Sequence, residues 1–441
     1  MRTTFVSLDR GTRAECEFLQ PDRWRDVLTL RPEEATIARG SGLSYVGASF
    51  AQGGTSIGMG RFDRILGFDS AQGWIEVEAG CTVGKLYSFL APRGLRLPVQ
   101  PGYPTITIGG CIAGNVHGKN HVREGVFGRH VLSLRLRHPD HGILECSETD
   151  NAEAFDLTIG GLGLTGIILS ARLALMPLEG TEVSEEHLPI ASLEEAFAEI
   201  ARLKDQADML YAWLDLSRPS HDTRGNGFIT LARTAPGVPL SSMPTLPGRL
   251  DPSGSELKRL PLFRAQTLPW VNRIYRAQAL RHRGPRRIPL ADFLFPAMGK
   301  ESYFHFFGNA GFFEQQVLLP ADAVASYLPD FRRILARHGA PVALTTLKAF
   351  GGGRNHLLHY DGEGFSFSID LPDTPESRAL AAELDELNGS VGGKTCVIKD
   401  GRLSAATARR QFPDYDQFRT RLAAFDPRRL FASELSRRLD L

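Results

Sequence analysis

One short segment, Gly161-Leu-Gly163-Leu-Thr-Gly166, limits most strongly what this chain can fold into. Its glycines match the G-x-G-x-x-G pattern of the Rossmann fold, in which a helix must follow so that its N-terminus holds a pyrophosphate. Here the next residues, Ile167 to Leu175, are aliphatic and end before Pro177, a pattern that predicts a buried strand. The sequence therefore argues against a Rossmann fold and favours a tight loop whose backbone N–H groups face a ligand.

The composition is that of a soluble globular protein. The 441 residues are enough for roughly two or three domains. A formal net charge of +1 gives no overall attraction to nucleic acid or to a membrane. The five cysteines form no C-x-x-C pair, so we expect neither structural zinc nor a disulfide framework, and a cytoplasmic location. No segment has the pattern of a signal peptide or a membrane span.

Short strands and helices follow one another irregularly along the chain. Residues 74–80 alternate between apolar and polar side chains, as a strand does, and Thr82 can cap a helix that ends near Gly94. Similar patterns predict strands at 36–39, 57–60, 65–68, 304–319 and 365–371, and helices at 21–28, 321–338, 379–388 and within the last forty residues. This order indicates an α+β fold rather than a regular βαβ array.

Two further glycine-rich segments could approach a ligand. One is Arg-Gly-Ser-Gly-Leu-Ser-Tyr at 39–45, and the other runs from Pro101 to His121. Glycine lets backbone amides reach phosphate oxygens, although a simple turn explains the first segment equally well. We interpret the second as a pocket wall that presents an imidazole and an ammonium group, with a solvated polar surface as the alternative. His117 and His121 are four residues apart, but glycines interrupt the segment and no third ligand lies nearby, so we expect no metal site.

Two lysines follow apolar, strand-like runs. Lys399 comes after Cys396-Val-Ile, and Lys348 comes after Leu344-Thr-Thr-Leu. Such lysines are usually solvated, but these two are candidates for contact with an anion or a substrate. The chain has no G-x-S-x-G, Walker, H-E-x-x-H or kinase motif, so hydrolase and phosphoryl-transfer chemistry have no support.

Taken in order, these segments resemble the flavin-dependent oxidoreductases of the p-cresol methylhydroxylase / vanillyl-alcohol oxidase (PCMH) fold. Within that fold the chain is most similar to the decaprenylphosphoryl-β-D-ribose oxidases. The resemblance covers about 39–177 and 304–441. It rests on 39–45, Pro101-Gly102 with 107–110, 117–121, 160–166, Lys399-Asp400, and Asp426-Pro427 with 431–434.

The resemblance implies an FAD-binding domain at 1–178, a substrate domain on an antiparallel sheet at 179–395, and a C-terminal segment, 396–441, that returns to the FAD domain. Relatives with covalent flavin carry histidine in R-G-x-G-H-S, where this chain has Leu43, so we expect noncovalent FAD. The implied FAD contacts are Arg39, Gly40, Ser41, Gly42, Leu43, Ser44, Tyr45, Pro101, Gly102, Thr107, Ile108, Gly109, Gly110, Asn115, His117, Gly118, Gly161, Gly163, Leu164, Thr165, Gly166, Ile167, Cys396 and Lys399.

The same resemblance implies the catalytic groups. Lys399 is the candidate for orienting the substrate hydroxyl and the flavin edge, and His117 is the alternative base. Where relatives have asparagine, cysteine and tyrosine, this chain has Ser366, Ser368 and Leu294, which puts the identity of the sugar or lipid in doubt more than the reaction type. The implied substrate contacts are Lys119, Gln316, Lys348, Ser366, Ser368 and Leu294.

Residues 236–289 form a basic, proline-rich insertion outside the strong resemblance. Nine prolines disfavour a central strand or a long helix, and ten Lys and Arg against two acidic residues give a local charge of +8. Aromatic residues among these charges suit docking on an anionic membrane, and a mobile solvated loop is the equal alternative. We therefore expect a cytoplasmic protein, with a peripheral position at the inner face of the membrane as an option.

The resemblance implies oxidation of the C2 hydroxyl of a polyprenylphosphoryl-β-D-ribose, the first half of an epimerisation to arabinose that a separate keto-reductase completes. The alternatives are a soluble sugar, alditol or aldonolactone oxidase of the same fold, or a non-catalytic flavin- or lipid-binding protein. We expect a monomer, with a lipid-phosphate-linked or free sugar as its substrate and no nucleic-acid partner.

Overall fold

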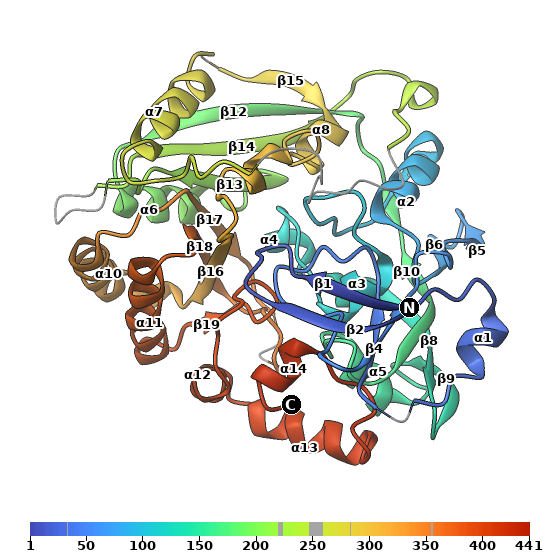
Figure 1. Ribbon diagram of the computed structural model, residues 1–441. Helices are drawn as coiled ribbons and strands as arrows, with labels where there is room; N and C mark the ends of the chain where they lie inside the picture. Colours follow the sequence, from blue (N-terminus) through green and yellow to red (C-terminus); the bar gives the residue numbers. More distant parts are fainter. Residues whose placement is uncertain (33, 219–223, 247–258, 283, 354–355) are drawn as a thin grey trace.

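The computed structural model of the protein describes residues 1–32, 34–218, 224–246, 259–282, 284–353 and 356–441. Figure 1 shows two regions beside each other. The first 180 residues form one region, and a large sheet within 182–395 forms the other. The last forty residues lie against the first region, with which they share an apolar core.

Two small sheets build the first region. In the sheet of order β1-β2-β4-β3, β4 (Thr55–Gly58) runs parallel to both β2 (Arg13–Leu19) and β3 (Thr36–Arg39), while β1 (Arg2–Val6) is antiparallel to β2. The second sheet is antiparallel and has the order β5-β6-β10-β8-β9. Its strands are β5 (Ile65–Asp69), β6 (Trp74–Glu78), β8 (Val131–His138), β9 (Gly142–Ser147) and β10 (Ile167–Ala174).

Short helices connect and cover these sheets. They are α1 (Trp24–Leu28), α2 (Val83–Leu90), α3 (Ile108–Ala113), α4 (His121–Glu124) and α5 (Ala152–Thr158), and a two-residue pair, β7 (Leu95–Arg96) with β11 (Met176–Pro177), accompanies them. As predicted, the Thr82 side chain accepts a hydrogen bond from the Lys85 backbone N–H at the start of α2, and the chain turns through a left-handed Gly94 after it. The predicted strand after Gly166 is also confirmed, because β10 begins at Ile167.

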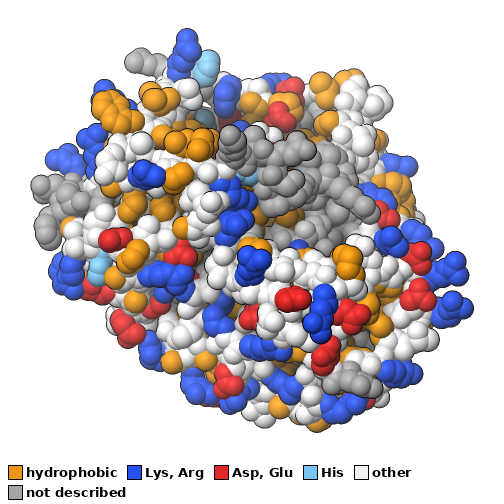
Figure 2. Space-filling model, viewed as in Figure 1, with side chains coloured by type: hydrophobic (Ala, Val, Ile, Leu, Met, Phe, Trp, Pro, Cys, Tyr) orange, Lys and Arg blue, Asp and Glu red, His pale blue; other side chains and the backbone are white. Residues whose placement is uncertain are grey.

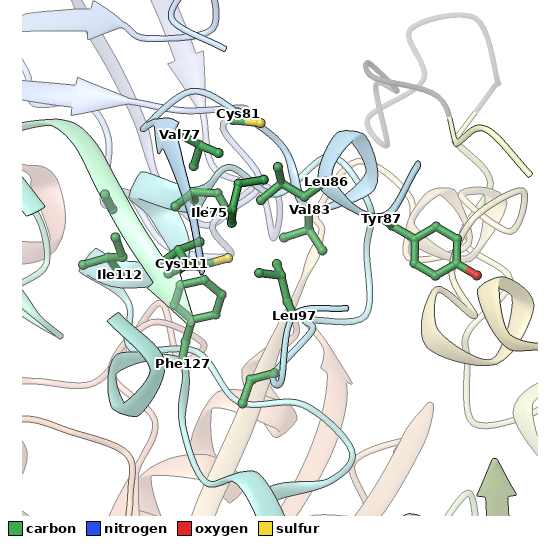
Figure 3. Close-up of a cluster of buried hydrophobic side chains, with 14 of the residues drawn as sticks. Ile75, Val77, Cys81, Val83, Leu86, Tyr87, Leu97, Cys111, Ile112 and Phe127 are labelled. Atoms are coloured by element: carbon green, nitrogen blue, oxygen red, sulfur yellow. The ribbon is translucent and has the colours of Figure 1, made fainter. Parts of the chain in front are cut away.

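The core of the first region lies between these helices and the second sheet. Figure 3 shows side chains of β6, α2 and α3 pointing toward one another, among them Ile75, Leu86 and Ile112, each essentially inaccessible to solvent. Tyr87 points away from this group and packs edge-on against Phe295, beyond α2. Helix α3 is therefore held by apolar contacts on one side while its N-terminal end stays near the glycine loops.

The large sheet is antiparallel and has the order β15-β12-β14-β13-β17-β18-β16-β19. Helices α6 (Leu193–Leu203), α10 (Val324–His338) and α11 (Pro375–Ser390) share one apolar core with it. Its strands are β12 (Glu182–Ile190), β13 (Met209–Leu214), β14 (Gly227–Ala235), β15 (Arg286–Pro289), β16 (Phe312–Leu319), β17 (Leu344–Phe350), β18 (Gly364–Pro372) and β19 (Lys394–Thr395). Every residue of β16 and β18 is buried, so polar side chains on these strands need partners inside the protein.

Three C-terminal helices pack against the first region. They are α12 (Ala405–Gln411), α13 (Tyr415–Phe425) and α14 (Glu434–Arg438). Phe418 and Leu435 share a core with Val46 and Leu164, and the Thr36 backbone N–H donates to the Leu430 carbonyl over 2.8 Å. The mixture of helices and sheets agrees with the predicted α+β class, while the predicted domain boundaries stay a prediction.

Several local predictions differ from the structure. The proline-rich insertion contains a twelve-residue helix, α7 (Leu268–Ala279), because Pro269 stands in its first turn, where no intrahelical N–H is needed. The insertion ends in strand β15, which lies at the edge of the large sheet, where proline is tolerated. Residues 302–305, partly predicted as strand, form α9 (Ser302–His305), after α8 (Leu290–Leu294). Residues 247–258 and 283 of the insertion lie outside the described residues.

The positions of two lysines relative to the strands also differ from the prediction. Lys348 lies inside β17, rather than after a strand, and Cys396-Val-Ile forms a turn after β19 that carries Lys399. Both side chains are at least partly withdrawn from solvent. Among the described helices, none has the length and apolar character required to cross a bilayer.

Candidate functional site

The loop 39–45 packs directly on the N-terminal end of α3. The Ser41 hydroxyl donates to the Thr105 carbonyl over 2.5 Å, and the Thr107 hydroxyl caps α3 by accepting from the Gly110 N–H over 3.3 Å. A Cβ on Gly40 would lie 2.2 Å from Oγ1 of Thr107, so only glycine allows this approach. The loop therefore lies directly against the start of α3.

The loop 160–166 closes on the other end of α3. The Gly160 N–H donates to Ile112 and the Leu162 N–H to Ala113, each over 2.9 Å to the carbonyl oxygen. A Cβ on Gly161 would lie 2.1 Å from the Leu157 carbonyl oxygen. Two glycine-rich loops thus pack against α3, one at each end.

Asn115 connects these loops to the C-terminal half of the chain. Its amide oxygen accepts from the Gly128 N–H over 2.9 Å, and its amide nitrogen lies 3.2 Å from Nδ1 of His359. Nε2 of His359 is 2.7 Å from the Ile159 carbonyl oxygen, so this nitrogen carries the proton and Nδ1 accepts from Asn115. Burial, first of all, lowers the pKa of His359 to about 4, which keeps the imidazole neutral in this role.

Lys399 forms the first side-chain cluster of the site. Its ammonium group is 3.1 Å from Oε2 of Glu314 and lies over the Tyr45 ring, 3.8 Å from the centroid. Burial alone lowers the pKa of a lysine, but the Glu314 carboxylate and other nearby acidic groups outweigh it and raise the pKa of Lys399 above its ordinary value. Lys399 is therefore a permanent cation and hydrogen-bond donor.

Two acidic residues stand side by side under this lysine. Glu314 on β16 is paired in register with Asp370 on β18, and the Tyr303 hydroxyl donates to Oδ2 of Asp370 over 2.5 Å. Burial and the Glu314 charge raise the pKa of Asp370. Sequence reasoning missed Glu314, Asp370 and Tyr303. The only signal was a charged residue at 314 within the strand-like segment 312–319.

His117 forms the second cluster. Nδ1 lies 3.1 Å from the Gly118 carbonyl oxygen and donates to it, which leaves the Nε2 lone pair facing the Gln316 amide nitrogen at 3.3 Å. Burial, then the charge of Lys348, lower the pKa of His117 well below its ordinary value. The imidazole is therefore neutral and can accept a proton at Nε2.

Gln316 connects His117 to the sheet. Its amide nitrogen also donates to the Ser366 hydroxyl over 2.8 Å, and Ser366 accepts from the Tyr360 hydroxyl over 3.0 Å. The amide oxygen of Gln316 is buried and has no hydrogen-bond partner among the described residues. Such an oxygen can accept from a hydroxyl or N–H group of a bound molecule.

Two half-buried lysines complete the polar wall. Nζ of Lys119 donates to the carbonyl oxygens of Phe293, over 2.8 Å, and Leu294, over 3.0 Å. Burial, and secondarily the charge of Lys348, lower the pKa of Lys119 to about 7. Burial lowers the pKa of Lys348 to about 8. Ser368 lies two residues after Ser366 on β18, and its hydroxyl is 2.7 Å from the Thr346 hydroxyl.

A cavity opens beside Lys119 and Leu294. Its other walls come from the turns before α3 and α4, from β13 and β14, and from the start of α8. They are Arg96, Pro98, Gln100, Asn120, Leu178, Asp208, Met209, Thr234 and Leu290.

The structure thus brings together most of the predicted substrate and catalytic residues. His117, Gln316 and Ser366 are joined by direct contacts, and the Cys396 N–H donates to the Gln316 carbonyl over 2.8 Å. Pro101 and Gly102 make none of these contacts. Among the described residues no group of three or more His, Cys, Asp or Glu side chains could hold a metal ion.

Comparison with known proteins assigns the first region. The model of the FAD binding domain matches residues 30–147. The chain is 30% identical to the decaprenylphosphoryl-β-D-ribose oxidase of Mycolicibacterium smegmatis over 92% of this chain and 89% of that protein. It is also 30% identical to an uncharacterized protein in the mprA 5′ region of Streptomyces coelicolor, over 82% of this chain and 100% of that protein.

A more distant likeness is confined to part of the chain. The mouse L-gulonolactone oxidase is 30% identical over 154 residues, which is 35% of each protein.

Proposed function

Because the chain belongs to the FAD-dependent oxidoreductases with a PCMH-type FAD-binding domain, the family that includes decaprenylphosphoryl-β-D-ribose oxidase, we propose that it oxidises a secondary sugar hydroxyl to a ketone. The observation that carries the proposal is that His117 contacts Gln316 and Lys399 contacts Glu314, two residues apart on β16, so that a neutral imidazole and an ammonium group lie over the same face of this strand. One group can take the hydroxyl proton while the other holds the oxygen.

The residues around α3 fit FAD. The loop 39–45 supports this best, because none of the N–H groups of 40–45 donates a hydrogen bond to a described residue, which suits the pyrophosphate. In 107–110 and 160–166 most backbone N–H groups already donate within the protein, so these segments support the loop from both ends of α3. The buried, unpaired amide oxygen of Gln316 suits an N–H or hydroxyl group of the cofactor or the substrate. Bound FAD supplies the acceptor for a hydride from the carbinol carbon.

FAD is held noncovalently in this proposal, because Leu43 has no nucleophilic side-chain atom. Acid precipitation tests this point: the yellow colour stays in the supernatant if the bond is absent, and it stays with the pellet if we are wrong.

In this mechanism one residue takes the proton of the substrate hydroxyl and another holds its oxygen. Nε2 of His117 takes the hydroxyl proton, since the neutral imidazole has its lone pair there while its Nδ1 proton is engaged by the Gly118 carbonyl. Lys399 donates a hydrogen bond to the same hydroxyl oxygen and orients it; Glu314 keeps this lysine protonated, so Lys399 is not the base. The Gln316 amide positions the imidazole until the substrate hydroxyl occupies the same lone pair.

The proposed substrate is a polyprenylphosphoryl-β-D-ribose, oxidised at its C2 hydroxyl. Lys119, Lys348 and Ser368 give the wall donors for sugar hydroxyls or for a phosphate. A ketone made at C2 needs a separate keto-reductase to complete an epimerisation to arabinose. The likeness to L-gulonolactone oxidase favours a second candidate, a soluble sugar, alditol or aldonolactone oxidase.

Anaerobic bleaching of the flavin distinguishes these candidates. We expect polyprenylphosphoryl ribose to bleach the oxidised flavin absorbance, and ribose, alditols and gulonolactone to leave it unchanged. Bleaching by a free sugar or lactone alone would establish the second candidate. No bleaching with any of them would leave a non-catalytic flavin- or lipid-binding protein and overturn the proposal.

A further inference from the structure

The outward face of α7 is unusually apolar for a surface helix. Trp270, Val271 and Ile274 are 60%, 42% and 57% exposed. Because Trp270 and Ile274 are four residues apart, their side chains lie one above the other on the same face. The turn that leads into the helix exposes Leu260 and Leu262 as well. Of the twelve large hydrophobic side chains exposed among the described residues, six lie between 260 and 275.

The same segment carries many basic side chains and no acidic residue of its own. Residues 259–290 contain eight arginines and no aspartate or glutamate. Arg286 and Arg287 are paired with Glu185 and Glu182 of β12. Arg264, Arg273 and Arg281 are exposed and form no ion pair within the part of the chain that the structure describes. In Figure 2 hydrophobic and basic side chains lie next to one another over α7, toward the upper left.

The inner face of α7 fixes the helix on the large sheet. The Asn272 amide donates to Oδ1 of Asp215 over 2.9 Å, and the Ala279 carbonyl oxygen is 2.8 Å from Nδ1 of His187. The Tyr275 ring packs edge-on against Trp213 of β13. The outward apolar side chains are therefore presented by a helix that is already anchored, and no refolding is needed to expose them.

The segment also connects to the functional site. Phe263 and Leu268 belong to a small aromatic cluster with Phe307 and Phe312, and Tyr45 packs on the same cluster. Tyr45 is the ring that Lys399 covers. The segment that carries α7 thus packs, through this buried cluster, onto the ring that Lys399 covers.

We propose that this surface, formed by Leu260, Leu262, Trp270, Val271 and Ile274 with Arg264, Arg273 and Arg281, docks the protein on an anionic lipid bilayer. Charge complementarity favours this occupant, since exposed arginines attract anionic head groups while tryptophan and aliphatic side chains enter the interface. Docking there brings the site to the surface in which a polyprenyl-linked substrate resides. The membrane contact goes beyond the proposed oxidation and holds whichever sugar is oxidised.

Vesicle flotation of the flavin-loaded full chain tests the proposal. We expect flotation with vesicles of phosphatidylcholine mixed with phosphatidylglycerol, little with phosphatidylcholine alone, and weakening at high salt. The pair Arg273→Gln with Arg281→Gln lowers partitioning roughly thirty-fold, at about fivefold for each charge removed. Trp270→Ser with Ile274→Ser lowers it about a hundredfold.

Matched variants elsewhere give the controls. Arg2→Gln with Arg13→Gln removes the same charge from exposed positions on β1 and β2, and Leu66→Ser with Leu132→Ser removes exposed apolar side chains of the first region. These controls should float like the wild type, and all variants should keep their flavin absorbance and melting temperature.

Absence of wild-type flotation with anionic vesicles would overturn the proposal, as would equal losses in the control variants. If the wild type instead forms a dimer that the α7 variants abolish, without binding vesicles, the surface is an interface between two copies of the chain. That outcome also contradicts the membrane proposal. Flavin bleaching by a soluble substrate tests the oxidation independently of all these results.

Discussion

The loops around α3 present backbone groups, whereas strands β16, β17 and β18 present side chains. In the first region a glycine at 40 or 161 is required because a Cβ would meet Thr107 or Leu157 at 2.2 and 2.1 Å. In the second, Glu314, Gln316 and Lys348 act through charge and hydrogen bonding. The comparison suggests that the loops set whether a cofactor binds and the strands set what reaction follows.

The strongest test of this division is Gly161→Ala. Its Cβ would meet a backbone carbonyl oxygen that cannot move aside cheaply, so we expect loss of flavin and a destabilisation of about 3 kcal/mol. Flavin content after gel filtration and urea unfolding measure these effects. Gly389→Ala in α11, where nothing lies within 4 Å, should retain both. A Gly161→Ala protein that purifies with full flavin would contradict the backbone role of this loop.

Lys399→Met tests the side-chain region. We expect flavin reduction by the substrate to slow by about 10²–10³-fold with FAD still bound, because an oriented charged donor is lost. Stopped-flow absorbance under anaerobic conditions measures it. Lys85→Met removes a lysine paired with Asp63 near the surface and is the control. Full turnover in Lys399→Met would show that another residue holds the substrate oxygen.

Glu314→Gln tests whether the Glu314 carboxylate keeps Lys399 protonated. Without the carboxylate, burial lowers the pKa of Lys399, so the ammonium form that donates to the substrate is lost as pH rises through the new pKa. We expect activity near the wild-type level at low pH and about a tenfold loss at alkaline pH. The pH dependence of kcat measures it, and Glu314→Asp should restore the alkaline activity. An unchanged profile in Glu314→Gln would mean that Glu314 does not control the protonation of Lys399.

The smallest expected effects come from two helix caps, one in each region. Thr107→Ala removes the cap of α3, and Thr374→Ala removes the equivalent cap of α11. Each should cost about 1 kcal/mol of unfolding free energy. Only Thr107→Ala should also weaken FAD binding, since α3 carries the loops. Calorimetry with added FAD compares the two variants. Equal FAD affinity in both would contradict the proposed division between cofactor-binding loops and reactive strands.

The sequence predicted the backbone region better than the side-chain region, for a physical reason. Glycine spacing, the Thr82 cap and the strand after Gly166 are local patterns, and the structure confirms them. The family and the FAD-dependent oxidoreductase activity, inferred from the order of those segments, are confirmed by the matched domain and by a relative aligned over most of the chain.

The side-chain region depends on strand register, which local sequence does not encode. Glu314 lies opposite Asp370, 56 residues later, only because β16 and β18 pair in this register. Lys348 seemed to end a strand, but the strand continues to Phe350 and half-buries the lysine. The helix α7 was missed because proline was counted against a helix without regard to its position in the first turn. The catalytic roles, noncovalent FAD, the monomeric state and the membrane contact stay predictions.

The pairing of Thr36 with Leu430 and Ala432 has a consequence for how the protein is made. Early in translation, the N-terminal sheets leave the ribosome without the helices that cover Val46 and Leu164. These apolar side chains stay exposed until α13 and α14 emerge and a loop of nearly four hundred residues closes, an entropic cost that grows only slowly with length. This core is therefore completed only when α13 and α14 pack on the N-terminal region, and until then its apolar side chains are open to aggregation.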